Sequence, residues 1–460
     1  MNPELLRNLW LQFSLQRVIA APLILGAIVA LISFGTSTDW SSIAWAANGG
    51  FFLIAYLWGA RRAVNVLADE IASGTWDGQR MSSIGPWTMA WGKIFGGTAY
   101  TWYCAGICLV AYIIAEIKLG NSNELLLELS LQMTGALLVQ AVALLLALVM
   151  VGKGRRLGRR SIAFAQGAAV LIGFFGVSHL LLPSIGLHLA SGLAQSVTWF
   201  GLNLPFEQFV LLTQCLFLAW ALVGVYRLMA SELQVPQGPW VWTLFSVFLI
   251  AYYQGFAVLG NDSGPSLRWA SALVVAVILY YVAIFAQSHD VIRYRWLLHH
   301  NRRGALGGVW TLAPLWAPSL VIAVIVAASL RYSAPIAALA EPELQGLLSL
   351  QHVVDPRHMT TALILFMVRD LGIVLLLNFA QRPKAPDLTA VLYLIVLYGV
   401  GGGLAIVLGA YRLLPWFVPG AGGNGLLVML APLIEVLAVF ALLWRRWTAQ
   451  GRALQPQPAA

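Results

Sequence analysis

The sequence predicts an all-α polytopic membrane protein of about twelve transmembrane helices in two sets of six. Of its 460 residues, 60% are apolar and only 10% are Asp, Glu, Lys or Arg, whereas a soluble domain carries roughly 25% charged residues. The apolar residues gather in stretches of about 17 to 23 residues, each long enough to cross a hydrocarbon core as a helix. Only short connections remain, so the chain has no room for a soluble nucleotide-hydrolysing domain.

The first predicted element is an amphipathic helix that precedes the first span. Leu6, Leu9, Trp10 and Phe13 recur at the i, i+3, i+4, i+7 spacing, and polar residues occupy the other side. A helix with such a stripe lies flat in the interface between headgroups and acyl chains. We therefore expect an interfacial helix on the cytoplasmic leaflet.

The apolar stretches divide into two sets at a polar break near residue 235. Spans are expected at about 18–34, 43–60, 95–115, 131–152, 161–182, 208–226, 240–260, 269–286, 311–330, 360–380, 389–411 and 425–444. The predicted domains are a first half over 1–235, a second half over 236–447 and a disordered cytoplasmic tail over 448–460. Two sets of six spans insert in the same orientation, so a parallel repeat and a single fold without internal symmetry are both compatible with the pattern.

The basic residues predict the orientation in the membrane. The net charge is +9; with the N-terminus placed in the cytoplasm, 21 of the 27 Lys and Arg residues lie on that side and one, Arg369, lies inside a span. The five on the other side are Lys118, Arg268, Arg331, Arg357 and Arg412. The positive-inside rule then places both termini in the cytoplasm, and the charge requires no nucleic-acid partner. We expect a multi-pass protein in the lipid bilayer of a bacterial inner membrane.

No catalytic or metal-binding motif is found in the sequence. It has neither G-x-S-x-G nor H-E-x-x-H, and Gly92-Lys93 is followed by isoleucine, so the phosphate-binding loop G-x-x-x-x-G-K-[ST] is missing as well. His352, Asp355 and His358 share one connection, where a solvated loop is the simpler interpretation than a metal site. We expect no catalytic residue and no metal.

Three ionisable residues lie inside predicted spans, where charge is costly. Arg369 and Asp370 interrupt the tenth span, and Glu435 lies in the twelfth. One interpretation is an ion pair between Arg369 and either Glu435 or Asp370 that holds the second half together. The other is a proton relay through Asp370 or Glu435.

The connection from Arg61 to Lys93 is the most informative cytoplasmic segment. Its candidate site residues carry charge, allow a turn or offer an apolar contact: Asp69, Glu70, Gly74, Thr75, Trp76, Asp77 and Arg80. The order of an acidic residue, Gly-Thr, a short apolar stretch, Pro and Gly-Lys is represented by Glu70, Gly74-Thr75, Met81–Ile84, Pro86 and Gly92-Lys93. In this order and in its topology the chain resembles the membrane subunits of type-2-like ABC exporters, the ABC-2 permeases.

The resemblance covers about residues 1–235 and implies a role for each of its parts. The N-terminal amphipathic helix is similar to the elbow helix of such permeases, and Pro183–Pro205 to their re-entrant hairpin. The 61–93 connection would form a coupling helix that docks on cytoplasmic ABC ATPase subunits, a dimer that binds ATP and Mg²⁺. This chain itself would bind no cofactor, and a second permease chain is a further possible partner.

Within that loop the residue chemistry suits docking. Gly74 allows a turn, Trp76 offers an apolar anchor, and the charged residues can pair with the partner around it. The second half departs from the family, because Ser288–Arg303 has no acidic-Gly-Thr sequence. Whether this half contacts an ATPase is open.

We therefore expect the permease subunit of an ABC transporter, acting as an exporter without ATPase motifs of its own. The alternative is a proton-coupled secondary transporter of twelve spans that uses Asp370 or Glu435. A membrane-embedded enzyme or an assembly scaffold is a third class. The substrate is left open among lipid, glycan, peptide and small toxic compound, because fold resemblance does not define a substrate.

Overall fold

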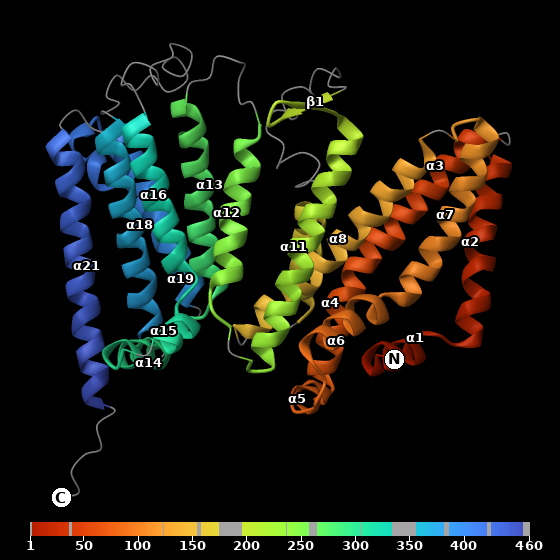
Figure 1. Ribbon diagram of the computed structural model, residues 1–460, viewed down its shortest axis with the longest axis horizontal. Coiled ribbons are helices and arrows are strands. Elements are labelled where there is room, and N and C mark those ends of the chain that lie inside the picture. The colour runs from red at the N-terminus through yellow and green to blue at the C-terminus, as the bar shows by residue number, and fades with distance from the viewer. Residues whose placement is uncertain are drawn as a thin grey trace, which may run out of the picture. The chain divides into compact units, whose positions relative to one another are not determined.

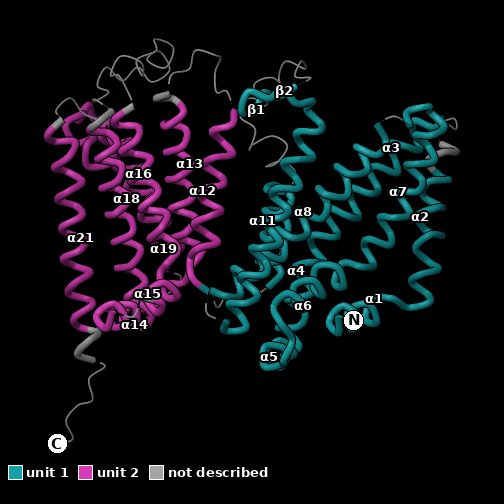
Figure 2. Tube along the Cα trace, in the orientation of Figure 1, with its two compact units in different colours: residues 1–237 teal, residues 238–460 magenta. Residues whose placement is uncertain are grey.

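The structure is a computed structural model that describes residues 2–35, 39–122, 124–153, 158–173, 196–235, 237–256, 265–304, 306–333, 356–380, 386–420 and 425–453. The chain forms two compact units, Met1–Gln237 and Gly238–Ala460 (Figure 2). Each unit is a bundle of helices (Figure 1), and a small β-hairpin belongs to unit 1.

The all-α polytopic fold is confirmed in its coarse form. Eight helices among the described residues are long and apolar enough to cross a membrane, and the pair α1 and α2, bent by 64°, makes a ninth candidate. Twelve spans are not confirmed. The predicted span at 311–330 is divided because Pro314 has no N–H for a helix, so α15 (Leu306–Leu312) ends before it and α16 (Trp316–Ser333) begins after it.

Unit 1 begins with a short helix and contains the longest candidate span, Trp40–Ala72, which runs through α3, η1 and α4. Its elements in order are α1 (Pro3–Gln12), α2 (Leu15–Gly35), α3 (Trp40–Phe51), η1 (Phe52–Trp58), α4 (Gly59–Ala72), α5 (Thr75–Arg80), α6 (Pro86–Trp91), η2 (Gly92–Gly96), α7 (Ala99–Leu119), α8 (Leu125–Gly152), α9 (Arg159–Val170), β1 (Ser196–Trp199), β2 (Leu202–Pro205) and α11 (Phe206–Glu232).

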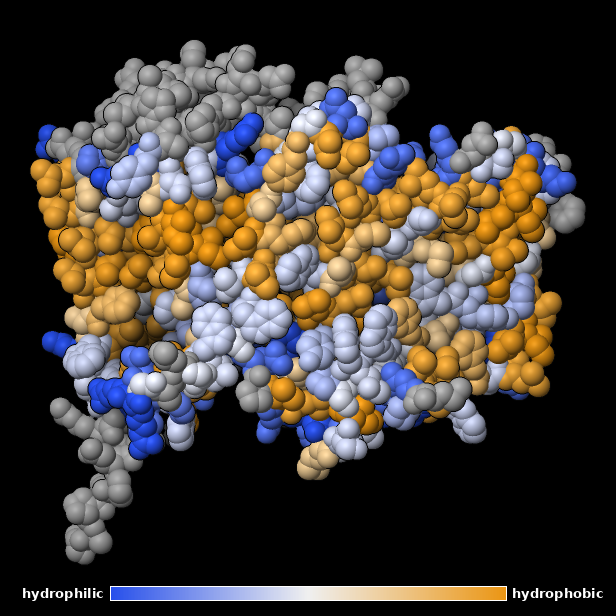
Figure 3. Space-filling model, in the orientation of Figure 1, coloured by the Kyte–Doolittle hydropathy of each residue, from blue (hydrophilic) through white to orange (hydrophobic). Residues whose placement is uncertain are grey.

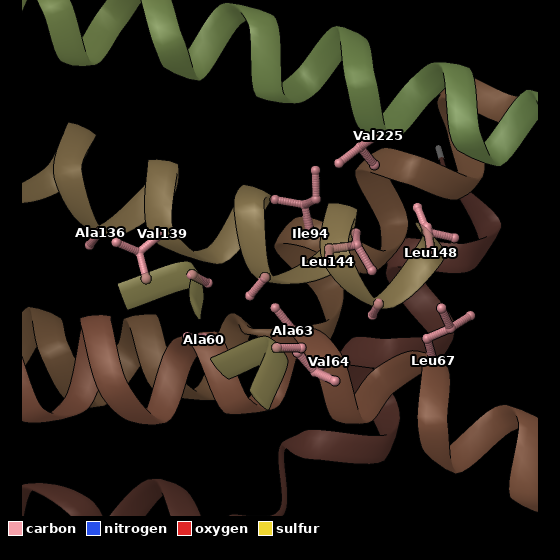
Figure 4. Close-up of a cluster of buried hydrophobic side chains, with 14 of the residues drawn as sticks. Ala60, Ala63, Val64, Leu67, Ile94, Ala136, Val139, Leu144, Leu148 and Val225 are labelled. Atoms are coloured by element: carbon pink, nitrogen blue, oxygen red, sulfur yellow. The ribbon is translucent and has the colours of Figure 1, made fainter. Parts of the chain in front are cut away.

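The core of unit 1 lies between α4, α8 and α11. Alanines such as Ala60, Ala63 and Ala136 are fully buried, and small side chains let helix backbones approach closely. Figure 4 shows larger apolar side chains, among them Val139 and Val225, in the same cluster. This packing fixes the inner part of unit 1, around which the connection from α4 to α7 is built.

Unit 2 is a second bundle with its own core. Its elements are α12 (Trp240–Gln254), α13 (Pro265–Ala286), α14 (Val291–Arg302), α15, α16, α18 (Pro356–Asn378), α19 (Pro386–Ile395), η4 (Val396–Gly401), α20 (Gly402–Val407), η5 (Tyr411–Trp416) and α21 (Gly425–Ala453). The core contains Tyr280, Met367 and Val374, from α13 and α18. Among the described residues α12 is shorter than the predicted span 240–260.

Two predicted segments differ from the structure. The tail predicted from residue 448 is helical as far as Ala453, the last residue of α21, and the Thr448 hydroxyl in this stretch donates to the Trp444 carbonyl oxygen at 3.1 Å. In the predicted re-entrant segment 183–205, residues 196–205 form an antiparallel β-hairpin, whose turn residues Phe200 and Gly201 have φ of 47° and 78°. The rest of that segment, the fifth span beyond residue 173 and the loop with His352 and Asp355 lie outside the described residues.

Candidate functional site

The 61–93 connection is a chain of short helices, which corrects the expected loop. Its first part, Arg61–Ala72, belongs to α4, which continues a candidate span. Gly74, with φ of 71°, ends that helix, and the hydroxyls of Ser73 and Thr75 both bond the Glu70 carbonyl oxygen, at 3.2 and 3.3 Å. A left-handed glycine is the usual residue after a helix end. The turn at Gly74-Thr75 thus leads directly from α4 into α5.

Helix α5 lies at the lower edge of unit 1 as drawn in Figure 1, below α6. Its outward side exposes Thr75, Asp77 and Gly78, and Met81, directly after the helix, is 84% exposed. The side chain of Asp77 is 80% exposed. Its inward side buries Trp76 and Gln79. The helix therefore offers a small surface of one acidic and one apolar side chain.

A cluster of charged side chains packs against the inward side of α5. We call it the Lys93 cluster, and its members are Glu4, Arg7, Glu70, Trp76, Gln79 and Lys93. The Lys93 side chain is fully buried. Its ammonium contacts Glu70, lies 3.3 Å from Glu4 Oε1 and 3.1 Å from Gln79 Oε1, and is 5.1 Å from the centre of the Trp76 ring.

Charge is balanced inside the Lys93 cluster. Arg7 contacts Glu70 and lies 2.9 Å from Glu4 Oε1, so two cations face two carboxylates. The Arg7 side chain is 37% exposed, whereas Lys93, Glu4 and Glu70 are buried. Removing either partner of a buried Lys93 pair leaves an uncompensated charge, which is strongly destabilising. The cluster therefore holds α1, α4, α5 and η2 in one arrangement.

The cluster corrects part of the predicted docking surface. Trp76 is only 4% exposed and Glu70 7%, because both face Lys93 within the chain, so neither is available as an anchor for a partner. Arg80 is also engaged internally, since its Nε donates to the Glu232 carbonyl oxygen of α11 at 3.0 Å. Of the predicted charged residues, Asp69 and Asp77 are exposed.

Glu4 and Arg7 were missed by sequence reasoning. They lie in the N-terminal helix, far from Lys93 along the chain. A signal was present, because Glu4, Asn8 and Gln12 follow one another at a spacing of four residues and so share one face of a helix. That row is the buried side of α1.

Helix α1 packs on η2 through polar side chains and exposes its apolar side. Gln12 Nε2 donates to the carbonyl oxygens of Gly96 and Gly97, at 2.8 and 2.6 Å, and Gln12 Oε1 accepts from the Tyr100 amide at 3.1 Å. Trp10 is 85% exposed. This polarity is the one expected of a helix held against protein on one side and facing lipid on the other.

The intramembrane residues of unit 2 also form one cluster, here called the Arg369 cluster: Arg369, Asp370, Glu435, Tyr281 and Tyr398. Arg369 contacts both carboxylates that the sequence offered as partners. Its Nε and Nη2 lie 2.9 and 2.8 Å from Asp370 Oδ1, and its Nη1 lies 2.6 Å from Glu435 Oε2. Its guanidinium also stacks on the Phe366 ring at 4.2 Å.

Asp370 is saturated with donors. Besides Arg369, the hydroxyls of Tyr281 and Tyr398 donate to its second oxygen at 2.6 and 2.7 Å, which uses all four lone-pair positions of the carboxylate. Asp370 is fully buried, whereas the Glu435 side chain is 18% exposed. With one cation and two carboxylates, the cluster carries a formal charge of −1.

A metal centre is not found in the part of the chain that the structure describes, where no three His, Cys, Asp or Glu side chains are grouped suitably. No family model, no curated protein and no solved structure matches the chain. The two charge clusters and the exposed surface of α5 are the features of the described residues that bear on function.

Proposed function

We propose that the chain is the permease subunit of an ABC exporter, moving its substrate by alternating access. ATP and Mg²⁺ bind to separate ATPase subunits, a cytoplasmic dimer, and the chain has no catalytic residues of its own. The observation that carries the proposal is the short helix α5, where Asp77 and the next residue after the helix, Met81, are exposed while the inner side is fixed by the Lys93 cluster.

A contact made by α5 is connected to several spanning helices. Gly74-Thr75 joins it directly to α4, the continuation of a candidate span of 33 residues. Gln79 and Trp76 join it to Lys93, which precedes α7, and Arg80 joins it to the end of α11. A force applied to α5 by an ATPase thus acts on α4, α7 and α11 together, which is the requirement for coupling without a phosphate-binding loop.

The test uses the exposed side chains of α5. We expect Asp77→Ala with Met81→Ala to reduce capture of an ABC ATPase that co-purifies with the tagged chain, and to uncouple ATP hydrolysis from transport. Loss of an anchor from a docking site commonly costs about 2 kcal/mol or more. Trp76 is unsuitable for this experiment, because its removal disturbs the Lys93 cluster.

The matched control lies on α14 of unit 2. Ile292 and Trp296 are 55% and 54% exposed, and Ile292→Ala with Trp296→Ala removes two exposed side chains from a short helix of the other unit. Capture of the ATPase and substrate-stimulated hydrolysis should stay close to wild type in the control if the first half carries the coupling contact. Unchanged capture and hydrolysis in the Asp77/Met81 variant would contradict the proposal.

A second candidate function, proton-coupled secondary transport, is favoured by one observation in unit 2. The Arg369 cluster has a formal charge of −1, and an unbalanced charge is costly inside a membrane. Uptake of one proton by Glu435 or Asp370 would neutralise the cluster. Against this, every lone pair of Asp370 is already engaged, as in a structural ion pair.

A further inference from the structure

The basic helix α14 forms one wall of an apolar groove in unit 2. Its volume is about 530 Å³, and its walls come from α14, α15 and the ends of α16, α18 and α21. The lining is largely apolar and includes Leu297, Trp316, Phe379, Phe440 and Trp444. Pockets of roughly 300 to 1,000 Å³ hold small organic ligands, so the groove can take one extended hydrocarbon chain.

The aromatic lining indicates the depth of the groove in the bilayer. Trp316, Trp444 and Trp447 all line it, and Trp444 is 68% exposed. Tryptophan gathers at the interface between the hydrocarbon core and the headgroups. Burial raises the pKa of Tyr294, another wall residue, to about 12, and its hydroxyl accepts from Trp316 Nε1 at 2.9 Å, so it remains neutral. The groove therefore lies at headgroup level, with apolar walls.

Two arginines contact residues that line the groove or adjoin its lining. The Arg295 guanidinium lies 5.1 Å from the centre of the Trp447 ring and donates to the Trp447 carbonyl oxygen at 3.2 Å. Arg446 of α21 donates to the Leu376 carbonyl oxygen of α18. Each guanidinium has five N–H donors, so both keep donors for a further anion.

The residues at the end of α14 are mainly basic. Helix α14 ends in His299, His300 and Arg302, and Figure 3 shows strongly hydrophilic residues at the lower edge of unit 2, where Figure 1 places α14 and α15. Two carboxylates adjoin helices of unit 2 in sequence. Asp290 precedes α14 and caps it by accepting from the Ile292 amide at 3.0 Å, and Asp387 lies in the first turn of α19.

We infer that this groove binds one anionic glycerophospholipid from the leaflet that α14 faces. One acyl chain lies along Leu297 and Phe440, and the phosphate is held by Arg295 and Arg446. Basic pockets between membrane helices select anionic headgroups because the cations offset the phosphate charge, whereas a zwitterionic headgroup gains much less. The inference is independent of ATP coupling.

The experiment measures lipid binding to the full-length chain by native mass spectrometry after delipidation in mild detergent. Phosphatidylglycerol and phosphatidylcholine with identical acyl chains are the two probes. We expect phosphatidylglycerol to bind roughly tenfold more tightly, and Arg295→Gln with Arg446→Gln to remove that preference, because each arginine contributes to attraction of the anion.

Two further variants separate the headgroup site from the groove. Arg445→Gln removes an equal charge from the adjacent residue of α21, and should leave the preference intact. Ala317→Phe fills the groove from α16, and should lower binding of both lipids at least fivefold. Thermal unfolding and size-exclusion profiles identify any variant that fails to fold.

Three outcomes would overturn the inference. Equal binding of the two lipids to the wild-type chain would indicate a general lipid contact without headgroup recognition. Undiminished phosphatidylglycerol binding by both the folded double variant and Ala317→Phe would place the lipid elsewhere. Tighter lipid binding after truncation at Ala453 would identify the last residues of the chain as the normal occupant of the groove.

Discussion

The ammonium nitrogen of Lys93 lies 3.3 Å from Oε1 of Glu4, a residue 89 positions earlier in the chain, and both side chains are buried. This contact joins the N-terminal helix α1 to η2. Because the same ammonium faces Gln79 of α5, the N-terminal helix and the candidate coupling helix are fixed to one buried charge. Movement of α5 is then expected to move α1 with it.

The first prediction concerns that charge. Lys93→Met should lower the free energy of unfolding by roughly 3 to 5 kcal/mol, because it leaves Glu4 and Glu70 as buried carboxylates with Arg7 as their remaining cation. Thermal unfolding in detergent measures the loss. Arg61→Met, at an exposed position of α4, is the control and should change little.

A double variant makes the same prediction sharper. Glu70→Gln added to Lys93→Met should recover part of the loss, because it removes the carboxylate that the first change left unpaired. If the two losses simply added, Lys93 and Glu70 would not be coupled, and the cluster would not be the unit that holds α5.

The second prediction tests the docking of α1. A Cβ atom at Gly96 would lie 2.8 Å from Asn8 Cβ and 3.3 Å from the Leu5 backbone, so Gly96→Ala should displace α1 and cost roughly 1 to 3 kcal/mol. Gly106→Ala in α7 is the control, because nothing lies within 4 Å of the added carbon. Proteolysis near the N-terminus and thermal unfolding should distinguish the two variants.

The third prediction is that the Arg369 cluster is structural. Asp370 accepts from Tyr281, Tyr398 and two nitrogens of Arg369, whereas the contact of Glu435 is with Arg369. Asp370→Asn should therefore reduce thermal stability more than Glu435→Gln, because it weakens more charge-assisted hydrogen bonds. Both should affect stability more than the pH dependence of transport.

The same variants test the second candidate function. The measurement is transport in proteoliposomes with and without an imposed proton gradient, together with thermal unfolding of each protein. A folded Glu435→Gln or Asp370→Asn variant whose transport no longer depends on the gradient would make proton coupling the leading function. Wild-type transport that requires ATP and ignores the gradient would favour the ABC assignment.

The fourth prediction concerns orientation. In a chain whose three cysteines are replaced by alanine, Gly78→Cys on α5 should be protected from an impermeant thiol reagent in intact cells, and Asn203→Cys on β2 should be labelled. Both positions are exposed in unit 1, and the excess of basic residues predicts that α5 lies in the cytoplasm. Labelling of Gly78→Cys in intact cells would contradict the predicted orientation.

Several features could be predicted from the sequence because they depend on local pattern. Long apolar stretches separated by short polar ones indicate spanning helices wherever they occur, since each helix satisfies its own backbone hydrogen bonds in lipid. The eight long candidate spans overlap predicted spans. The stripe from Leu6 to Phe13 likewise predicted a helix, and α1 covers Pro3–Gln12.

Two predictions from the sequence were wrong for a local physical reason. Polar residues in 61–93 suggested a loop, but helix α4 continues to Ala72 because its polar positions meet other parts of the chain: Glu70, for example, meets Lys93 and Arg7. Pro314 divided an apolar stretch that hydropathy alone treats as continuous. Hydropathy counts residues, whereas helix ends depend on backbone geometry and on partners.

The sequence by itself determined that the chain is a multi-pass membrane protein and where its charged exceptions lie. Only the tertiary structure decided what those exceptions contact. It turned Trp76 and Glu70 inward to Lys93, brought Glu4 to the same cluster, and gave Arg369 both of its carboxylates at once. The reason is that a buried charge needs an opposite charge close in space, and residues 89 positions apart become neighbours only when the helices between them pack.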